Sequence, residues 1–231
     1  MENSFVPERQ QYSIVLIGHF NPAMFHPDWF CKNEIISAED ASTALDEASA
    51  TPLLLSNQLT LFRTTQFYIK IEPNRFQLVA EKEPLDTLKD FIVNTLACLG
   101  STDIRAYGYN YSAHYAVPSD EMYQMIGDNL APKKYWGMLL GDEVAGVNRK
   151  SGLIGLQMQK NKEDESGKII ITFQPSAQLK RGVFIACNNH NVMKDGEDSA
   201  EFALKQINTE FKDVMLYMRD LQVNLMDEVT K

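Results

Sequence analysis

The feature that most constrains the fold is an order of elements that occurs twice along the chain. A strand is predicted at residues 12–17, where a β-branched run ends at Gly18. An insert over residues 21–50 follows it, and then come three closely spaced strands and a long amphipathic helix that Gly100 ends. A strand at residues 103–116 begins the same order again. The pattern predicts an α+β protein built from a duplicated strand–insert–three-strand–helix unit.

Alternating apolar and polar side chains support the strands. Phe67, Ile69 and Ile71 alternate with polar residues, and this period of two is typical of an antiparallel meander with one apolar face. For the second half we predict strands at Tyr135–Leu140, Gly152–Lys160, Lys168–Pro175 and Gly182–Asn188, and a turn at Asn188–Asn191. We therefore expect one or more antiparallel sheets with two long helices packed on one face. The domain prediction is a single domain, residues 1–231, made of two similar halves (about 1–100 and 101–231).

This order of elements resembles the saddle of TATA-box-binding-like folds and the helix-grip arrangement. The resemblance implies an antiparallel sheet backed by helices. It carries no function, because unrelated activities occur on the same fold.

The last helix, from about Ser199 to the C-terminus, has an apolar seam with two interpretations. Seven residues follow a strict 3,4 spacing: Leu204, Ile207, Phe211, Val214, Met218, Leu221 and Leu225. Such a heptad seam predicts either a coiled coil that makes a dimer or a helix lying on a sheet. Met215 and Tyr217 widen the apolar face, which favours the sheet. A homodimer could also form through the far end of the helix, where Met226 and Val229 extend the apolar surface.

Composition excludes several classes of protein. The chain has 22 Lys and Arg against 31 Asp and Glu, a net charge of −9, so this acidic protein is not expected to bind nucleic acid backbones. Three cysteines lie far apart in the sequence, which indicates reduced thiols and a cytoplasmic location. The polar N-terminus cannot serve as a signal peptide, and no apolar run approaches the ~18 residues needed to span a membrane.

The segment from Gly18 to Phe30 is the densest unusual stretch. One hypothesis makes His19, His26 and Asp28 an acid–base group, or a metal site completed by Cys31. The spacing supports neither, because a second pair of ligands is missing. The competing interpretation is that the segment's aromatic residues pack into the core or against a partner. Those residues are Phe20, Phe25, Trp29 and Phe30.

A row of tyrosines is the second candidate surface. Strand alternation places four tyrosines and Arg105 on one face of the predicted strand at 103–116, namely Tyr107, Tyr109, Tyr111 and Tyr115. The other face carries small residues that would let a helix approach closely. We therefore expect the tyrosine row on the open side of the sheet, where the rings could contact a ligand or partner. Alternatively, tyrosines simply suit strands and pair with their neighbours.

Asn110 and His114 share the small-residue face and, with Trp136, could line a pocket between sheet and helix. A histidine there can equally be a hydrogen-bonded core residue. The chain contains no phosphate-binding loop, nucleophile elbow, paired Cys-x-x-Cys or His-Glu-x-x-His pattern. We therefore predict no cofactor and no metal.

Three functions follow in order of preference. The first is a non-enzymatic binding or assembly protein that holds another protein, or its own copy, with the aromatic segment and the tyrosine row. The second is a small-molecule-binding protein with the pocket near Asn110, His114 and Trp136. The third is a hydrolase-like enzyme that uses His19, His26 and Asp28, whose side chains would have to converge in a cleft.

Overall fold

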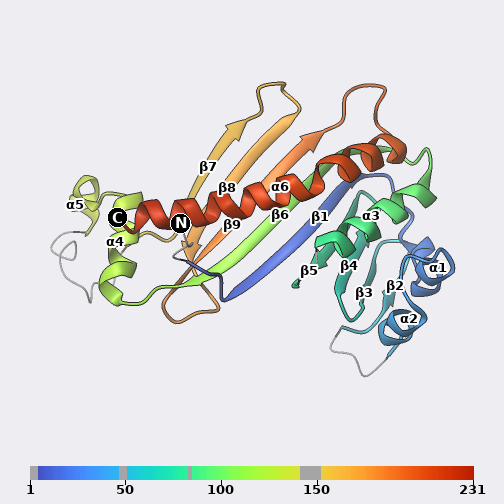
Figure 1. The fold of residues 1–231 in the computed structure, drawn as a ribbon, viewed down its shortest axis with the longest axis horizontal. Helices are drawn as coiled ribbons and strands as arrows, with labels where there is room; N and C mark the ends of the chain where they lie inside the picture. The colour runs from blue at the N-terminus through green and yellow to red at the C-terminus, as the bar shows by residue number, and fades with distance from the viewer. Residues whose placement is uncertain (1–4, 47–50, 83–84, 141–151) are drawn as a thin grey trace.

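Nine antiparallel strands form one sheet in the part of the chain that the structure describes, residues 5–46, 51–82, 85–140 and 152–231 (Figure 1). In this computed structural model the strand order is β2-β3-β4-β5-β1-β6-β9-β8-β7. The strands are β1 (Arg9–Gly18), β2 (Leu54–Leu55), β3 (Thr60–Arg63), β4 (Phe67–Glu72), β5 (Arg75–Ala80), β6 (Ile104–Ala116), β7 (Leu156–Asn161), β8 (Gly167–Pro175) and β9 (Gly182–Val192). The predicted α+β class with an antiparallel sheet is confirmed.

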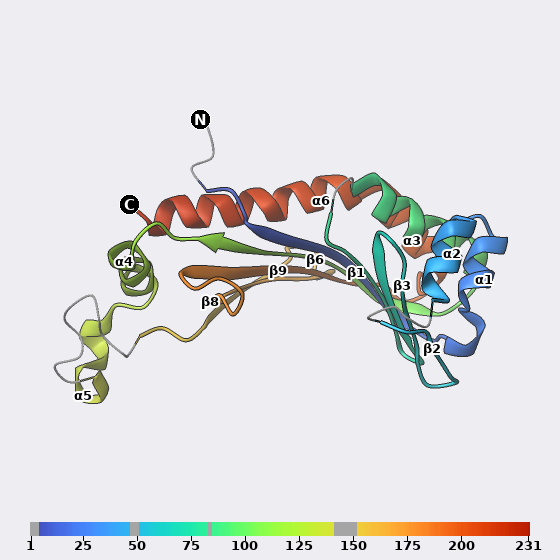
Figure 2. The same ribbon diagram turned by 90° about the horizontal axis from the view of Figure 1, so that it is seen from below.

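Six α-helices and two short 3-10 turns occupy the same described residues. They are η1 (Pro22–Met24), α1 (Pro27–Lys32), α2 (Ala38–Ala44), α3 (Leu85–Leu99), α4 (Asp120–Leu130), η2 (Lys133–Trp136), α5 (Gly137–Leu140) and α6 (Ala200–Val229). Figure 2 shows α3 and α6 above the same side of the curved sheet, and α4 and α5 beyond one end of it. The side occupied by α3 and α6 is called the helix side below, and the opposite side is the open face.

The centre of the sheet is the pairing of β1 with β6. All ten residues of β1 have a partner in β6, and β1 also pairs with β5 on its other edge. Tyr12 lies opposite Tyr111 and Ile14 opposite Tyr109, so their side chains share the helix side. Tyr12, Ile14 and Leu16 of β1 are almost fully buried there, and burying each such side chain stabilises the fold by about 1.5–3 kcal/mol.

Helix α6 packs on the sheet with a stripe of 3.6-residue periodicity instead of the heptad seam. It begins after Ser199, whose hydroxyl accepts a hydrogen bond from the N–H of Phe202. Its buried residues are Ala200, Ala203, Ile207, Phe211, Met215, Met218, Gln222, Val223, Met226 and Val229. Four members of the heptad seam are only partly buried, namely Leu204, Val214, Leu221 and Leu225. The wider stripe is what a helix needs to cover β6 and β9.

Two local predictions are wrong. Residues Tyr135–Leu140 form the end of η2 and helix α5 instead of a strand. Residues Asn188–Asn191 continue β9 instead of making a turn. In the second case β6 supplies a long partner whose pairing with β9 extends to Val192, and this ladder outweighs the local preference of asparagine for turns.

Gly18 makes possible the close approach of the ends of β1 and β6. The register shifts between Ile17 and Gly18, and a Cβ atom on Gly18 would lie 2.1 Å from the carbonyl oxygen of Asp103. We expect Gly18→Ala to lower the free energy of unfolding by about 1–3 kcal/mol, because the backbone would have to move. Urea denaturation measures the change. Gly137→Ala is the control, since nothing lies within 4 Å of its added Cβ atom; equal losses in both variants would contradict this account.

Candidate functional site

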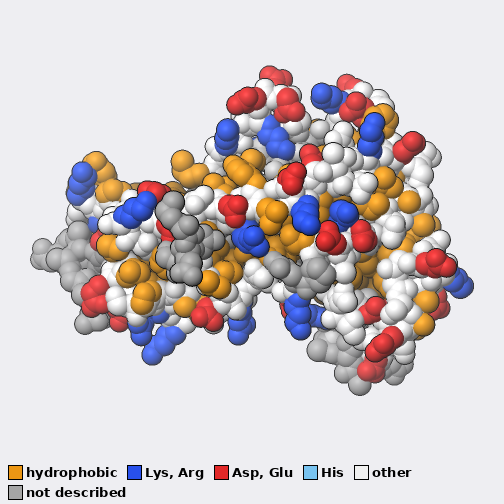
Figure 3. Space-filling view, viewed as in Figure 1, with side chains coloured by type: hydrophobic (Ala, Val, Ile, Leu, Met, Phe, Trp, Pro, Cys, Tyr) orange, Lys and Arg blue, Asp and Glu red, His pale blue; other side chains and the backbone are white. Residues whose placement is uncertain are grey.

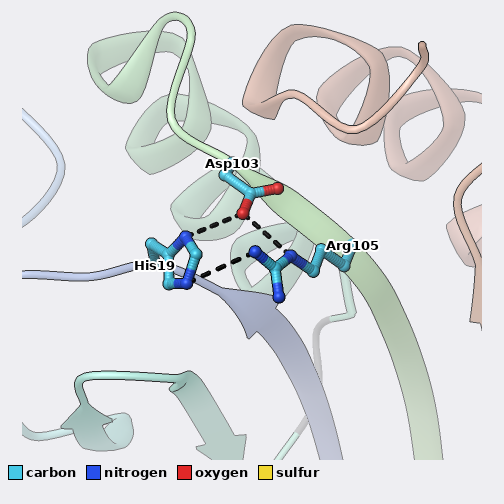
Figure 4. Close-up of polar contacts among 3 residues, drawn as sticks. All are labelled: His19, Asp103 and Arg105. Atoms are coloured by element: carbon cyan, nitrogen blue, oxygen red, sulfur yellow. Dashed lines mark hydrogen bonds and ion pairs between the residues drawn. The ribbon is translucent and has the colours of Figure 1, made fainter. Parts of the chain in front are cut away.

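A cluster of His19, Asp103 and Arg105 joins the ends of β1 and β6 (Figure 4). The N–H of His19 donates to the carbonyl oxygen of Asp103 at 3.0 Å. The Oδ2 atom of Asp103 lies 2.8 Å from Nδ1 of His19 and accepts a hydrogen bond from Nε of Arg105 at 2.9 Å. Nη2 of Arg105 lies 3.4 Å from Nε2 of His19, which closes the triangle.

The contacts of His19 suit one tautomer of the neutral ring. A guanidinium group only donates hydrogen bonds, so in the tautomer that accepts from Arg105 at Nε2 the proton lies on Nδ1 and is donated to Asp103. Both ring nitrogens of His19 are thereby engaged, and its side chain is 65% exposed to solvent. The arrangement fastens two strand ends together and brings no nucleophile to the histidine. Asp103 is not among the predicted site residues. Its spacing of two from Arg105 is a signal that could have found it, because residues two apart in a strand lie on the same side.

His26 and Asp28 form a separate contact at the start of α1. Nδ1 of His26 accepts a hydrogen bond from the N–H of Asp28 at 3.2 Å, which caps the helix. The same nitrogen is 3.4 Å from Oδ2 of Asp28. A nitrogen that accepts from the backbone carries no proton, so this second contact is no ion pair in that state. The contacts thus divide His19 from the other two members of the predicted acid–base group.

The aromatic segment lies mainly in the core. Phe20, Phe25 and Phe30 are buried, and Trp29 is half-buried against Phe25 and Phe30 at ring-centroid distances of 5.2 and 5.0 Å. The rings of this segment also contact Phe62, Phe76 and Phe91 of the elements around it. These aromatic residues therefore pack into the core and offer little surface to a partner.

The tyrosine row does not lie on the open side of the sheet, so that prediction is wrong. The side chains of Tyr107, Tyr109, Tyr111 and Tyr115 are buried on the helix side, between β6 and α6. Tyr109 packs against Phe211 of α6 with ring centroids 5.7 Å apart. Alternation along the strand was predicted correctly, but which face α6 would cover depends on residues that lie about a hundred positions away.

Two polar residues of α6 accept hydrogen bonds from three of the four tyrosine hydroxyls, and the fourth, that of Tyr111, donates to Gln10 of β1 at 3.2 Å. Oε1 of Glu210 accepts hydrogen bonds from Tyr107 at 2.8 Å and from Tyr109 at 3.1 Å. Gln222 accepts from the hydroxyl of Tyr115 at 3.2 Å, and its Nε2 donates to a backbone oxygen of β6 at 3.0 Å. Burial, followed by the nearby charge of Glu210, raises the pKa of both Tyr107 and Tyr109 well above the usual range. These hydroxyls act as donors that fix the position of α6 on the sheet.

Replacing Glu210 tests this role. We expect Glu210→Ala to lower the free energy of unfolding by about 1–3 kcal/mol, because two part-buried hydroxyls lose their acceptor. Glu210→Gln keeps an oxygen acceptor and should lose less than the alanine variant. Asp213→Ala, at an exposed position of the same helix, is the control for helix propensity and charge. Urea denaturation of the three variants compares them, and equal stability of Glu210→Ala and wild type would refute the role.

Asn110 and His114 lie on the open face. The prediction that they line a pocket between sheet and helix is therefore wrong. The amide of Asn188 donates to Oδ1 of Asn110, across β6 and β9. Nδ1 of His114 is 2.8 Å from the hydroxyl of Ser176, and the ring packs on Phe184 at 4.7 Å. His114 borders a groove of about 640 Å³ whose other lining residues are Pro7, Glu8, Arg9, Gln10, Gln11, Glu81, Lys82, Ser112, Gln178 and Phe184.

Two histidines on the open face should make the protein less stable in acid. Burial lowers the pKa of His114 from its ordinary 6.5, with a further contribution from Arg9. Burial also lowers the pKa of His190, with contributions from Lys168 and Lys162. As the pH falls below 6.5, the unfolded chain therefore binds protons more readily than the folded one, and the free energy of unfolding falls. In the double variant with His114→Gln and His190→Gln, the free energy of unfolding should change less between pH 7 and 5, as urea denaturation measures it. An unchanged slope would show that these two histidines do not cause the loss of stability in acid.

Trp136 lies at a different place, at the end of the molecule formed by α4, η2 and α5. Five large apolar residues there each expose more than half of their surface, and together they are called the α5 surface: Tyr135, Trp136, Met138, Leu139 and Ile154. Three of them, Trp136, Leu139 and Ile154, line a mostly apolar cavity of about 340 Å³. The ammonium group of Lys133, which also borders the cavity, is paired with Asp128. Sequence reasoning missed this surface because it assigned residues 135–140 to a strand.

Comparisons with known proteins give no family. No protein-family model matches the chain, and the search of curated proteins found no match. Within the described ranges, no three His, Cys, Asp or Glu side chains are grouped so that they could hold a metal ion. No helix in those ranges has the length and apolar character needed to cross a membrane. Function therefore has to be inferred from the surfaces of this chain.

Proposed function

We propose that the protein is a non-enzymatic binding protein that holds another protein at the α5 surface. The observation that carries the proposal is a set of five exposed apolar side chains at one end of the molecule, three of which line an apolar cavity. Apolar surface exposed at a cavity of this kind typically marks an interaction site. The α5 surface takes the role of binding site that was expected for the aromatic segment and the tyrosine row, because both of these are largely buried.

The chemistry of the cavity favours apolar side chains of a protein as its occupant. Its lining includes Trp136, Leu139, Leu153 and Ile154, and the charge of Lys133 is already neutralised by Asp128. A charged metabolite would find no unpaired ion there among the lining residues. An amphipathic helix or loop can place leucine-like side chains in the cavity while its polar face remains in water. Aromatic residues such as Trp136 and Tyr135 commonly dominate the binding energy of such contacts.

The sheet is proposed to consist of two similar halves. The strand order supports the proposal, because β5, β4, β3 and β2 extend outward from β1 in the same way that β9, β8 and β7 extend from β6. Each series is followed in sequence by a long helix, α3 or α6. In this arrangement α4, η2 and α5 belong to the insert of the second half.

Fluorescence of Trp136 tests the proposal. The chain has two tryptophans, so Trp29→Phe leaves Trp136 as the single reporter. Proteins captured from the native source would be purified and added back to this variant. We expect a true partner to shift the Trp136 emission to shorter wavelengths, and Leu139→Glu to weaken its binding at least tenfold in calorimetry, because a buried unpaired carboxylate is costly. Binding that leaves both readouts unchanged, or failure of every captured protein to bind again, would refute the proposal.

A second candidate function is the binding of a polar small molecule in the groove beside His114. The observation that favours it is the size of the groove, about 640 Å³, together with polar lining groups from Arg9, His114 and Gln178. Ser112→Tyr would fill the groove and leave the α5 surface intact. If Ser112→Tyr loses small-molecule binding and Leu139→Glu keeps it, the binding site is the groove.

A further inference from the structure

Strand β7 is an exposed edge of the sheet. In the described part of the chain it pairs only with β8, and five of its six residues are exposed. An edge of this kind presents unpaired backbone N–H and C=O groups to which another strand can add. Natural edges are commonly protected by proline, by a bulge or by several charges. β7 contains no proline, its register with β8 is regular, and Lys160 is its one charged residue.

The hairpin geometry identifies the backbone groups that point outward. The N–H of Lys162 donates to the carbonyl oxygen of Gly167 at 2.9 Å. In an antiparallel ladder, hydrogen-bonded pairs recur at every second residue. Lys160 and Met158 therefore bond to β8, and the backbone groups of Gln157 and Gln159 face away from the sheet.

An apolar strip on the helix side leads to this edge. Met158 lies opposite Ile171 of β8, which lies opposite the buried Cys187 of β9. Ile169 and Ile171 are only half-buried, because α6 contacts β6 and β9, and Met158 is 61% exposed. Figure 3 shows hydrophobic side chains at the surface beside α6, in the region where Figure 1 places β7 and β8. The strip would continue without a break into a strand added at β7.

We propose that β7 pairs with β7 of a second copy of this chain, antiparallel, about a two-fold axis at Met158. In this register Gln157 pairs with Gln159 of the other copy through their outward backbone groups. Met158 faces its own counterpart on the helix side, and Lys160 faces Leu156. The strand is thus complementary to itself, which is what an isologous interface requires.

Other registers fit less well. A shift by two residues in one direction places Met158 opposite Lys160, and a shift by four places Lys160 opposite itself, where like charges repel. A shift in the other direction leaves only residues 156–158 of β7 paired within the strand. This proposal rests on the β7 edge alone and is independent of the partner proposed for the α5 surface.

Cysteine cross-linking tests the register. Residues directly opposite each other in an antiparallel pair have Cβ atoms about 4.5–5.5 Å apart, close to the spacing of a disulfide. In a background with Cys31→Ser and Cys98→Ser, we expect Met158→Cys to form covalent dimers on mild oxidation. Lys160→Cys is the matched control, because the two copies of residue 160 would be about 13 Å apart. At least tenfold more cross-linking at position 158 than at position 160 is expected, and equal yields would overturn the register.

Proline substitution tests the edge itself. Gln159→Pro removes an outward N–H that β8 does not use, so the sheet should tolerate it, and Gln159→Thr keeps the N–H. We expect light scattering to give a dimer for wild type and Gln159→Thr and a monomer for Gln159→Pro, with circular dichroism confirming that all three are folded. A wild-type protein that stays monomeric at all concentrations overturns the proposal. That is the result expected if the natural occupant of the edge is an extended peptide instead of a second copy. A dimer that survives Gln159→Pro and fails to cross-link at position 158 also overturns it.

Discussion

The rest of the structure depends on the antiparallel pairing of β1 with β6. This ladder joins residues that are about a hundred positions apart in sequence and makes one continuous sheet from the two halves of the chain. Its register places Tyr12 beside Tyr111 and Ile14 beside Tyr109, which creates the apolar floor under α6. At its end, the register shifts at Gly18, where His19 contacts Asp103, and the polar cluster there fastens the two strand ends.

The two faces of the sheet differ because of what α6 provides. The tyrosines of β6 are large, and each carries a hydroxyl that needs an acceptor when it is buried. Glu210 and Gln222 supply the acceptors for Tyr107, Tyr109 and Tyr115 from within or beside the apolar stripe of the helix, and Gln10 of β1 accepts from Tyr111. Such hydrogen bonds favour one position of the helix over its alternatives, since a sliding helix would leave polar groups unpaired. The open face keeps the small and polar residues of β6, and a groove beside His114 remains there.

The two proposed interaction surfaces lie at the margins of the sheet, among the residues that the structure describes. The α5 surface lies beyond the end of the sheet, and β7 is the last strand on one side. Ile154 of the α5 surface precedes β7 by two residues, so the two surfaces adjoin along the chain. Both consist mainly of uncharged side chains in a protein whose net charge is −9. That contrast is expected for surfaces that contact other proteins, because charged residues are depleted at the centre of such interfaces.

The sequence by itself determined the class of the fold, most of the strands and helices, and which residues share a face. Local physics is sufficient for these features: a period of two fixes the alternation in β6, and Ser199 fixes the start of α6. Only the tertiary structure decided which face of β6 the helix covers, so the tyrosine row became core instead of surface. It also decided that β9 continues through Asn188–Asn191, that His19 meets Asp103 and Arg105, and that residues 137–140 are helical. Each of these outcomes depends on contacts between distant segments, whose free energies exceed the local preferences that can be read along the chain.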